Sequence, residues 1–350
     1  MGPFSPHRGL AGTGWFAAAG LQERCILLSR MSILITVYNA EAVLERTLKQ
    51  LATCEIGDSE VIASLDGCTD RSEEIVRRHP FVKVIVNRER LGKTLNNKKL
   101  FEASTGDLIF MLDDDHFLFC NRRQFDQLLQ LFEADPALGG VVCPIPEVVN
   151  VQRHARKIKS ALAFGDALLQ KFLAEFRIRH YTKAVNGRLY MDREKCGYPF
   201  QVVVFRRQAA PFQSTLVDDT ERSVQILENG FKVLVLTDDL EYPHATPFPD
   251  LEVPQKLTFG GLVRQKTRNM YGITELEHKY KRGLGVQRFY LPFAGYVLLN
   301  LVRHPSYVFP VLYASLVFAA ATLAGKLIYL KGLDSTKAWG LGIKKRDAWR

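Results

Sequence analysis

The sequence lacks any pair of cysteines at the spacing of a metal site or a redox motif. Its six cysteines are scattered along the chain: Cys25, Cys54, Cys68, Cys120, Cys143 and Cys196. This pattern is typical of reduced cytosolic thiols, and it argues against a disulfide framework or a cysteine-ligated zinc site.

The first thirty residues also lack the signals of a structured or targeting segment. Gly, Pro and Ala dominate up to Gly20, and no apolar stretch is followed by a cleavage site, so we read no secretory signal. The glycines between Gly9 and Gly14 do not follow a strand, which excludes a dinucleotide fingerprint there. Because Met31 directly precedes the first convincing strand, we expect residues 1–30 to be a flexible extension or an over-called start.

Acidic residues are too few to balance the basic ones. The chain has 350 residues, enough for one large domain or two, and carries 47 Lys and Arg against 37 Asp and Glu, a net charge of +10. Such a charge suits nucleic acid, an anionic membrane surface or a phosphorylated substrate. The positive charge gathers near the apolar C-terminal region, so we expect a membrane and not nucleic acid as the partner.

From Met31 onward, predicted strands and helices alternate with short connections. The strands are 32–36, 60–65, 82–86 and 107–112, and the helices are 40–52, 69–78 and 94–103. Such alternation predicts right-handed βαβ units on a mostly parallel sheet, with a Rossmann-like N-terminal half.

The most informative segment runs from Ile109 to His116, where an apolar strand ends in three carboxylates, Asp113, Asp114 and Asp115. Adjacent anions repel one another, so a fold gathers them where a cation or several donors neutralise them. Carboxylate oxygens suit Mg²⁺ or Mn²⁺, and strand ends in α/β sheets are where ligands bind. The alternative is an acidic turn that caps the next helix.

Other predicted strand ends carry related chemistry. Asp66 ends the second strand and is followed by Gly67, which permits a tight turn. Arg90 and Lys93 follow the third strand and bring cations to the same edge of the sheet. Cations, a helix N-terminus and a carboxylate cluster would together hold a diphosphate and its metal. Alternatively, Asp66 is a turn or cap residue and the two cations belong to a solvated loop.

These segments together resemble a family 2 glycosyltransferase with the GT-A fold. The resemblance is carried, between about Met31 and Asp239, by Thr36-Val-Tyr-Asn39 with Glu41, Asp66–Asp70, Gly92-Lys93, Gly106-Asp107, Asp113–Asp115, and Asp218–Glu221 with Gly230. It implies a transferase domain over residues 31–245, with Thr36 standing where the family commonly has proline. It also implies that the nucleotide-binding residues are Thr36, Tyr38, Asn39, Glu41, Asp66, Arg90, Lys93, Asp113 and Asp114.

The resemblance further implies site roles. Asp66 would read uracil, and Asp113 and Asp115 would bind Mg²⁺ or Mn²⁺. Asp219, at the start of a predicted helix, would be the catalytic base of a single inverting displacement, although acidic residues are ordinary at helix starts. His116 and His244 are either extra ligands or structural residues.

Two further segments are expected on the acceptor and diphosphate side. Gly187 and Arg188 lie in a stretch that resembles the family's glycine-containing strand beside the acceptor, although a plain strand edge explains them equally. Gln265 and Arg268 match the Gln-x-x-Arg-Trp motif of polysaccharide synthases, but Asn269 replaces the Trp, which weakens the case for a processive polymerase. We expect residues 246–288 to form this acceptor-side segment, which also suits a basic amphipathic helix on lipid headgroups.

Long apolar runs are confined to the C-terminal region. Residues 307–330 are long enough to span a bilayer, whereas 289–302 are short and contain Pro292. Basic residues flank both runs, so a membrane hairpin over 289–331, with the basic tail 332–350 and the catalytic domain on the cytosolic side, satisfies the positive-inside tendency. The alternative is a helical pair packed on the enzyme or on a partner. We expect a bacterial or archaeal cell membrane.

The sequence therefore predicts an inverting glycosyltransferase that uses a nucleotide-sugar, expected to be a UDP-sugar. The acceptor would be a lipid, a lipid-linked glycan or a growing glycan at the membrane surface, with partners from an envelope-polysaccharide assembly. Two alternatives stay open: a nucleotidyltransferase on a related sheet, and a non-catalytic subunit of a polysaccharide-export assembly.

Overall fold

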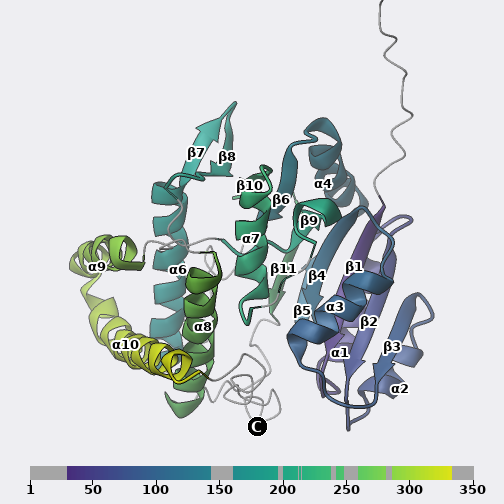
Figure 1. Ribbon diagram of the computed structural model, residues 1–350, viewed down its shortest axis with the longest axis horizontal. Helices are drawn as coiled ribbons and strands as arrows, with labels where there is room; N and C mark the ends of the chain where they lie inside the picture. Colours follow the sequence, from purple (N-terminus) through teal and green to yellow (C-terminus); the bar gives the residue numbers. More distant parts are fainter. Residues whose placement is uncertain are drawn as a thin grey trace, which may run out of the picture.

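The computed structural model describes residues 30–142, 161–195, 200–211, 213, 215–237, 242–247, 259–280 and 286–332. In these parts of the chain, a twisted mixed sheet forms one side of the molecule and a group of long helices forms the other (Figure 1). The expected extension 1–30, apart from Arg30, lies outside the described residues, as does the basic tail after Gly332.

The predicted βαβ units are confirmed. The elements are β1 (Met31–Val37), α1 (Leu44–Thr53), β2 (Glu60–Asp66), α2 (Ser72–Arg77), β3 (Val82–Asn87), α3 (Lys93–Ala103) and β4 (Leu108–Asp113). The four strands are parallel in the order β3-β2-β1-β4. Side chains that alternate along β1 enter different cores, since Ile33 packs in the cluster that includes α1 and Leu34 in the cluster that includes α3. The carboxyl ends of these strands therefore meet at one edge of the sheet.

The second half of the sheet is mixed. It contains β6 (Leu138–Val142), β7 (Thr182–Val185), β8 (Arg188–Met191), β9 (Val204–Arg206) and β10 (Lys232–Val235), and among the described residues the full order is β3-β2-β1-β4-β9-β6-β10-β8-β7. The strand β9 runs antiparallel to both β4 and β6. A separate antiparallel pair joins β5 (His116–Phe119) to β11 (His244–Pro247), and α4 (Arg122–Ala134) follows β5 behind a capping box at Asn121.

Two glycines in β6 bring helix α7 (Asp218–Glu228) close to the sheet. A Cβ added to Gly139 would lie 2.5 Å from the Cβ of Phe231, and one added to Gly140 would lie 2.6 Å from Cδ1 of Ile226. Side chains at these positions would push Ile226 and the chain just after α7 outward, so the small residues set how close the helix lies to the sheet.

The helical side of the molecule consists of α6 (Ala161–Tyr181), α8 (Phe259–Lys279), α9 (Val286–Arg303) and α10 (Val308–Leu330), with the 3₁₀ turn η3 (Pro305–Tyr307) joining the last two. Helix α10 packs on α6 and α8, and α9 packs on α6. In Figure 1, α9 and α10 meet at a corner, so two apolar helices are confirmed but their antiparallel pairing as a hairpin is not.

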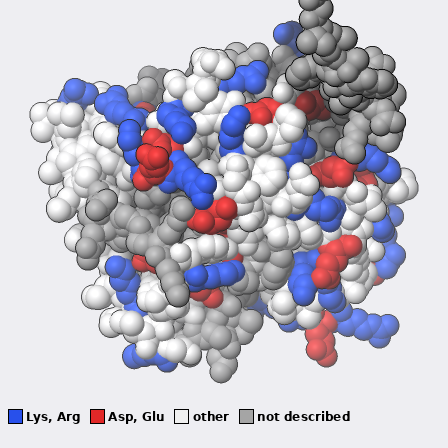
Figure 2. All heavy atoms as spheres, turned by 45° about the horizontal axis from the view of Figure 1, so that its top comes forward, with Lys and Arg blue, Asp and Glu red and all other residues white. Residues whose placement is uncertain are grey.

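Residues Pro305–Leu330 form one helical stretch of 26 residues, long and apolar enough to cross a membrane, and its most apolar window of 18 residues has a mean hydropathy of 1.9. Only 28% of its most apolar window is buried, unlike the core helix of a soluble protein. Figure 2 shows that the side of the molecule on which α9 lies consists mainly of residues other than Lys, Arg, Asp and Glu.

Glycines fix α10 at two points along its length. Gly165 of α6 lies directly against the backbone carbonyl of Pro310. A Cβ added to Gly325 would lie 2.9 Å from both the Cβ of Met270 and the backbone oxygen of Thr267 on α8. Both contacts bring helix backbones closer together than any larger side chain would allow.

We predict that Gly325→Ala destabilises the protein, because the new methyl group must push α10 away from α8. Overpacking of this kind costs about 1–3 kcal/mol. Gly295→Ala on α9 is the matched control: no described atom lies within 4 Å of the added Cβ, and alanine favours the helix. Thermal unfolding of the purified variants measures the difference, and equal melting temperatures would contradict the close docking of α10.

Candidate active site

One ammonium group connects two groups of carboxylates that are far apart in sequence. Lys93 opens α3, and its Nζ lies 3.2 Å from Oδ1 of Asp113 at the end of β4. The same Nζ lies 3.9 Å from Oδ1 of Asp218 at the start of α7. The acidic run and the helix-opening acidic pair therefore belong to one site, with a cation between them.

The acidic run forms a cluster suited to a divalent metal. Asp113, Asp115 and His116 each offer a ligand atom, and these atoms lie within 4.8 Å of one another. The Nδ1 of His116 lies 2.9 Å from Oδ1 of Asp115, because β5 begins immediately after the turn. The two carboxylates match the oxygen ligands of Mg²⁺ or Mn²⁺, so they fit the expected metal.

The two aspartates that open α7 differ in their surroundings. Asp218 is buried, and its Oδ2 accepts hydrogen bonds from Arg222 at 3.0 Å and from Nδ2 of Asn97 at 3.1 Å. Asp219 is less buried and accepts a 2.7 Å hydrogen bond from the backbone N–H of Thr220. Asp218 is thus held by cationic and amide donors, which leaves Asp219 as the better proton acceptor of the pair.

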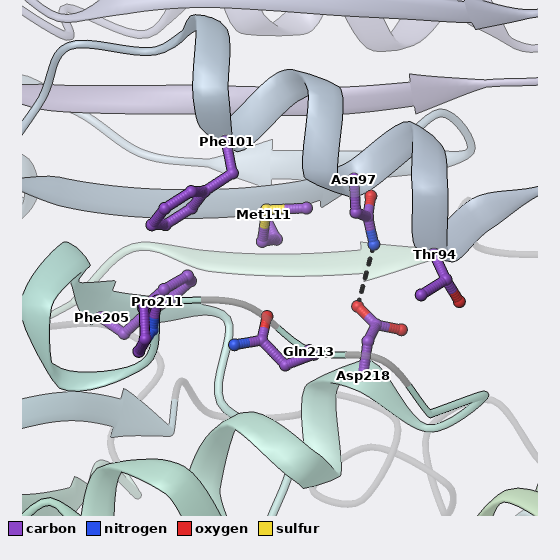
Figure 3. Close-up of a pocket in the computed structure, with 8 residues that line it drawn as sticks. All are labelled: Thr94, Asn97, Phe101, Met111, Phe205, Pro211, Gln213 and Asp218. Carbon is purple, nitrogen blue, oxygen red and sulfur yellow. Dashed lines mark hydrogen bonds between the residues drawn. The ribbon is translucent and has the colours of Figure 1, made fainter.

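Figure 3 shows how Asn97 reaches Asp218 across a small cavity. The cavity has an apolar side, formed by Phe101, Met111, Phe205 and Pro211, and a polar side formed by Thr94, Asn97, Gln213 and Asp218. The Asn97 hydrogen bond fixes the start of α7 relative to α3. The same helix, α3, supplies Lys93 four residues earlier, so it carries two of the three partners of Asp218, and Arg222 of α7 is the third.

Electrostatic coupling extends across this cluster. Burial, followed by the charge of Asp218, raises the pKa of Asp219, while Lys93 and Arg222 oppose the rise. The Asp113 carboxylate, assisted by Asp218 and Asp219, holds the pKa of Lys93 well above its ordinary value. Raised values for a base and for a neighbouring cation are common where charges are arranged for catalysis.

Arg268 lies within the field of the same carboxylates. Burial lowers the pKa of its guanidinium, and Asp113, Asp218 and Asp219 oppose this shift. The structure therefore brings the arginine of the degenerate motif to the cluster, as the sequence indicated. Gln265, one turn earlier on α8, is exposed.

The expected nucleotide-binding loops lie beside one another. The guanidinium of Arg90 lies 4.1 Å from the ring centroid of Tyr38, in a cation–π contact. Asp114 is buried, and its Oδ2 accepts a 3.2 Å hydrogen bond from the backbone N–H of Tyr38. Asp66 is also buried and accepts hydrogen bonds from the backbone N–H groups of Leu91, at 2.7 Å, and Gly92, at 3.0 Å. In this structure the two aspartates thus position the loops that carry Tyr38 and Arg90.

The remaining predicted residues of the loop after β1 connect that loop to the loop after β2. Oδ1 of Asn39 accepts a 2.8 Å hydrogen bond from the backbone N–H of Thr69. Oε2 of Glu41 accepts a 3.1 Å hydrogen bond from the backbone N–H of Arg71. Thr36 pairs in register with Asp113, next to the acidic cluster.

Gly187 and Arg188 lie apart from these contacts. They belong to the exposed β7–β8 hairpin, whose turn has positive φ at Asn186 (50°) and Gly187 (75°). The glycine-containing strand of the sequence analysis is therefore two strands and a turn. Among the described residues, neither Gly187 nor Arg188 bonds to the carboxylate cluster.

Sequence reasoning missed Asn97 and Arg222. Arg222 stands four residues after Asp218, the spacing at which helical side chains meet, so the spacing itself was an available signal. Asn97 lies 121 residues from its partner, and no pattern in the sequence links the two.

A protein-family model matches the part of the chain that contains the parallel half of the sheet. Residues 32–193 match the model of glycosyl transferase family 2. Residues 32–193, which contain the parallel half of the α/β sheet, are therefore similar to a family 2 glycosyltransferase domain. The search of curated proteins returned no match.

Similar solved structures are also glycosyltransferases, at low sequence identity. The mannosyltransferase PcManGT from Pyrobaculum calidifontis, in complex with GDP-Man and Mn²⁺, is 18% identical with a TM-score of 0.48, covering 87% of this chain and 79% of that chain. Residues 1–349 of S. aureus TarS, in complex with UDP-GlcNAc, are 13% identical with a TM-score of 0.45, covering 87% of this chain and 92% of that chain. A longer TarS structure is covered over 39% of its length.

The cation beside Asp219 predicts a specific pH dependence. Asp219 must be deprotonated to act as a base, so its raised pKa places the acid limb of the rate profile above the ordinary aspartate value. Lys93→Met removes a charge that lowers this pKa, so the acid limb should move to higher pH. Lys93→Arg should keep the limb near its wild-type position. Profiles of kcat/KM at saturating metal test this, and an unmoved limb in Lys93→Met would contradict the coupling.

Proposed function

We propose that this protein is an inverting, metal-dependent glycosyltransferase that transfers a sugar from a nucleotide-sugar to an acceptor hydroxyl at a membrane surface. The observation that carries the proposal is the meeting of the metal-type cluster, Asp113 with Asp115, and the helix-opening pair, Asp218 with Asp219, around Lys93. Such an arrangement supports a single displacement, because it would bring a leaving diphosphate and a proton acceptor together in one site.

The donor is expected to be a UDP-sugar, held by the loops that carry Tyr38, Arg90 and Lys93. The neighbouring Tyr38 ring and Arg90 guanidinium offer an aromatic face and a positive charge near the loop that Asp66 organises. Asp113 and Asp115, with His116 beside them, would hold Mg²⁺ or Mn²⁺, which neutralises the diphosphate when bound.

In the mechanism, a carboxylate oxygen of Asp219 takes the proton of the acceptor hydroxyl. The acceptor oxygen then attacks the anomeric carbon from the face opposite the nucleotide, and the bond from that carbon to the diphosphate oxygen breaks. Lys93 and Arg268, which already lie in the field of the carboxylates, supply positive charge where the diphosphate develops its own negative charge. Inversion follows because there is one displacement.

The acceptor is proposed to be a lipid, a lipid-linked glycan or a growing glycan, because an exposed apolar helix lies in the same helical group as Arg268. We propose that the catalytic domain lies on the cytosolic side of a cell membrane, where envelope-polysaccharide proteins are candidate partners. The family match argues against the nucleotidyltransferase alternative, and the simultaneous presence of Asp113, Asp115 and Asp219 argues against a non-catalytic subunit.

Asp115→Asn should abolish metal-dependent turnover while the protein still folds, because one anionic ligand is lost with little change of shape. Isothermal titration of Mn²⁺ in the presence of UDP measures the metal directly, and release of nucleoside diphosphate from a panel of nucleotide-sugars measures turnover. Asp126→Asn, on the exposed face of α4, is the matched control. Unchanged Mn²⁺ affinity in Asp115→Asn would remove Asp115 from the metal site.

Asp219→Asn should lower transfer by about 10²–10⁴-fold, the usual loss for a general base, and leave UDP binding intact. Asp218→Asn provides the contrast, because it weakens the buried ion pair with Arg222 and should lower the melting temperature as well. Binding of UDP by calorimetry, thermal melting and transfer assays separate the two roles. Loss of UDP binding in Asp219→Asn without a selective loss of transfer would make Asp219 a structural residue.

A further inference from the structure

Helix α10 exposes a continuous apolar stripe. Its exposed large side chains, with between 49% and 74% of their surface accessible, are Phe309, Leu312, Leu316, Leu323, Leu327 and Leu330. The intervals of three, four and seven residues place all six on one face of the helix. We call this face the α10 stripe.

The opposite face of α10 is docked on the protein along most of its length. Near its beginning, Tyr313 stacks on Phe259 of α8 and Val317 packs with Leu162 and Leu262. Near its end, Gly325 lies against α8 and Tyr329 contacts the ring of Tyr271. No large part of α10 extends beyond the two helices that flank it.

Both flanking helices carry ion-paired charged side chains. The Nζ of Lys266 on α8 lies 2.8 Å from Oδ1 of Asp166 on α6, and α6 also carries the ion pair of Lys171 with Glu175. Charged side chains in hydrocarbon are costly, so α6 and α8 do not enter the bilayer core. A helix that lies beside them over most of its length therefore does not cross the bilayer in this arrangement.

The composition of the sequence that contains α9 and α10 favours an anionic lipid surface. Residues 281–333 contain no Asp or Glu, and their basic residues are Lys281, Arg282, Arg288, Arg303, Lys326 and Lys331. Helix α9 continues the apolar surface with four exposed side chains, those of Leu291, Leu298, Leu299 and Val302.

From these observations we infer that α10 lies in the plane of an anionic bilayer and does not span it. The α10 stripe enters the boundary between headgroups and acyl chains, α9 continues the contact, and α8 lies between the lipid and the active site. The protein is then attached to one leaflet. The inference deepens the proposed membrane location, but it does not depend on which sugar or acceptor the enzyme uses.

The depth of the α10 stripe in the bilayer tests whether α10 lies in the membrane plane. An encoded ketone-bearing amino acid at positions 312, 316, 323 and 327 allows spin labelling that leaves the native cysteines untouched. In vesicles of phosphatidylcholine and phosphatidylglycerol, accessibility to oxygen and to a nickel chelate reports the depth of each label. An in-plane helix gives four similar shallow depths, of about 5–10 Å. A maximum near the bilayer centre, with shallower ends, would show a spanning helix and overturn the inference.

A negative charge introduced into the α10 stripe tests whether an anionic bilayer is the partner. Leu316→Asp should lower binding to the same vesicles at least tenfold, because it places a carboxylate in the boundary and repels anionic lipid. Leu95→Asp is the matched control, since Leu95 is 46% exposed in the first turn of α3, where an acidic residue favours the helix. Thermal melting should be unchanged in both variants, because both leucines are exposed.

Two outcomes would overturn the inference here. One is equal vesicle binding by Leu316→Asp and Leu95→Asp. The other is a detergent-free dimer that Leu316→Asp dissociates, which would show that a second copy covers the stripe. Release of nucleoside diphosphate from the donor is measured in parallel. Turnover and vesicle binding are measured separately. Turnover that persists while vesicle binding falls shows that the two can be separated, so a failure of this inference can be distinguished from a failure of the proposed function.

Discussion

The positive charge of the Lys93 ammonium group compensates the negative charges of two carboxylates that would otherwise repel each other. Asp113 and Asp218 belong to segments about 100 residues apart, and without a cation between them their carboxylates would repel. The parallel half of the sheet fixes one carboxylate, α7 fixes the other, and α3 supplies the cation from its first turn. The two glycines of β6 contribute to the same end, because they let α7 lie close to the sheet that carries Asp113.

Local pattern predicted the parallel half of the fold well. Apolar runs and helical spacing located β1 to β4 and α1 to α3 to within a few residues, since these elements depend mainly on their own periodicity. The short antiparallel strand β9 was not predicted, because its three residues take their conformation from β4 and β6 on either side. The hairpin at Gly187 was predicted as one strand, although the positive φ angles of Asn186 and Gly187 make a turn there.

The residues of the candidate site also divide into those that the sequence predicted and those that it did not. Acidic residues at strand and helix ends were visible in the sequence, and so was Arg268, because each belongs to a compact motif. Residues that hold those groups in place were less visible. Asn97 acts through a contact that only the folded chain creates, and the buried Asp114 supports the backbone of Tyr38 from within the acidic run itself. Motif residues therefore indicate the chemistry of a site better than they indicate how it is positioned.

The contacts of Glu221 connect α7, the helix that carries Asp219, to the helical side of the molecule. This buried carboxylate on α7 accepts hydrogen bonds from Lys279 and Tyr280 at the end of α8, and from the backbone N–H of Thr215. Asp219, two residues away, is thus rigidly joined to α8, and α8 to α10. If α10 rests on the lipid surface, the height of the base above that surface is set by the fold. The enzyme would then select acceptors by distance, because it would reach hydroxyls at one distance from the bilayer and exclude those held closer or farther away.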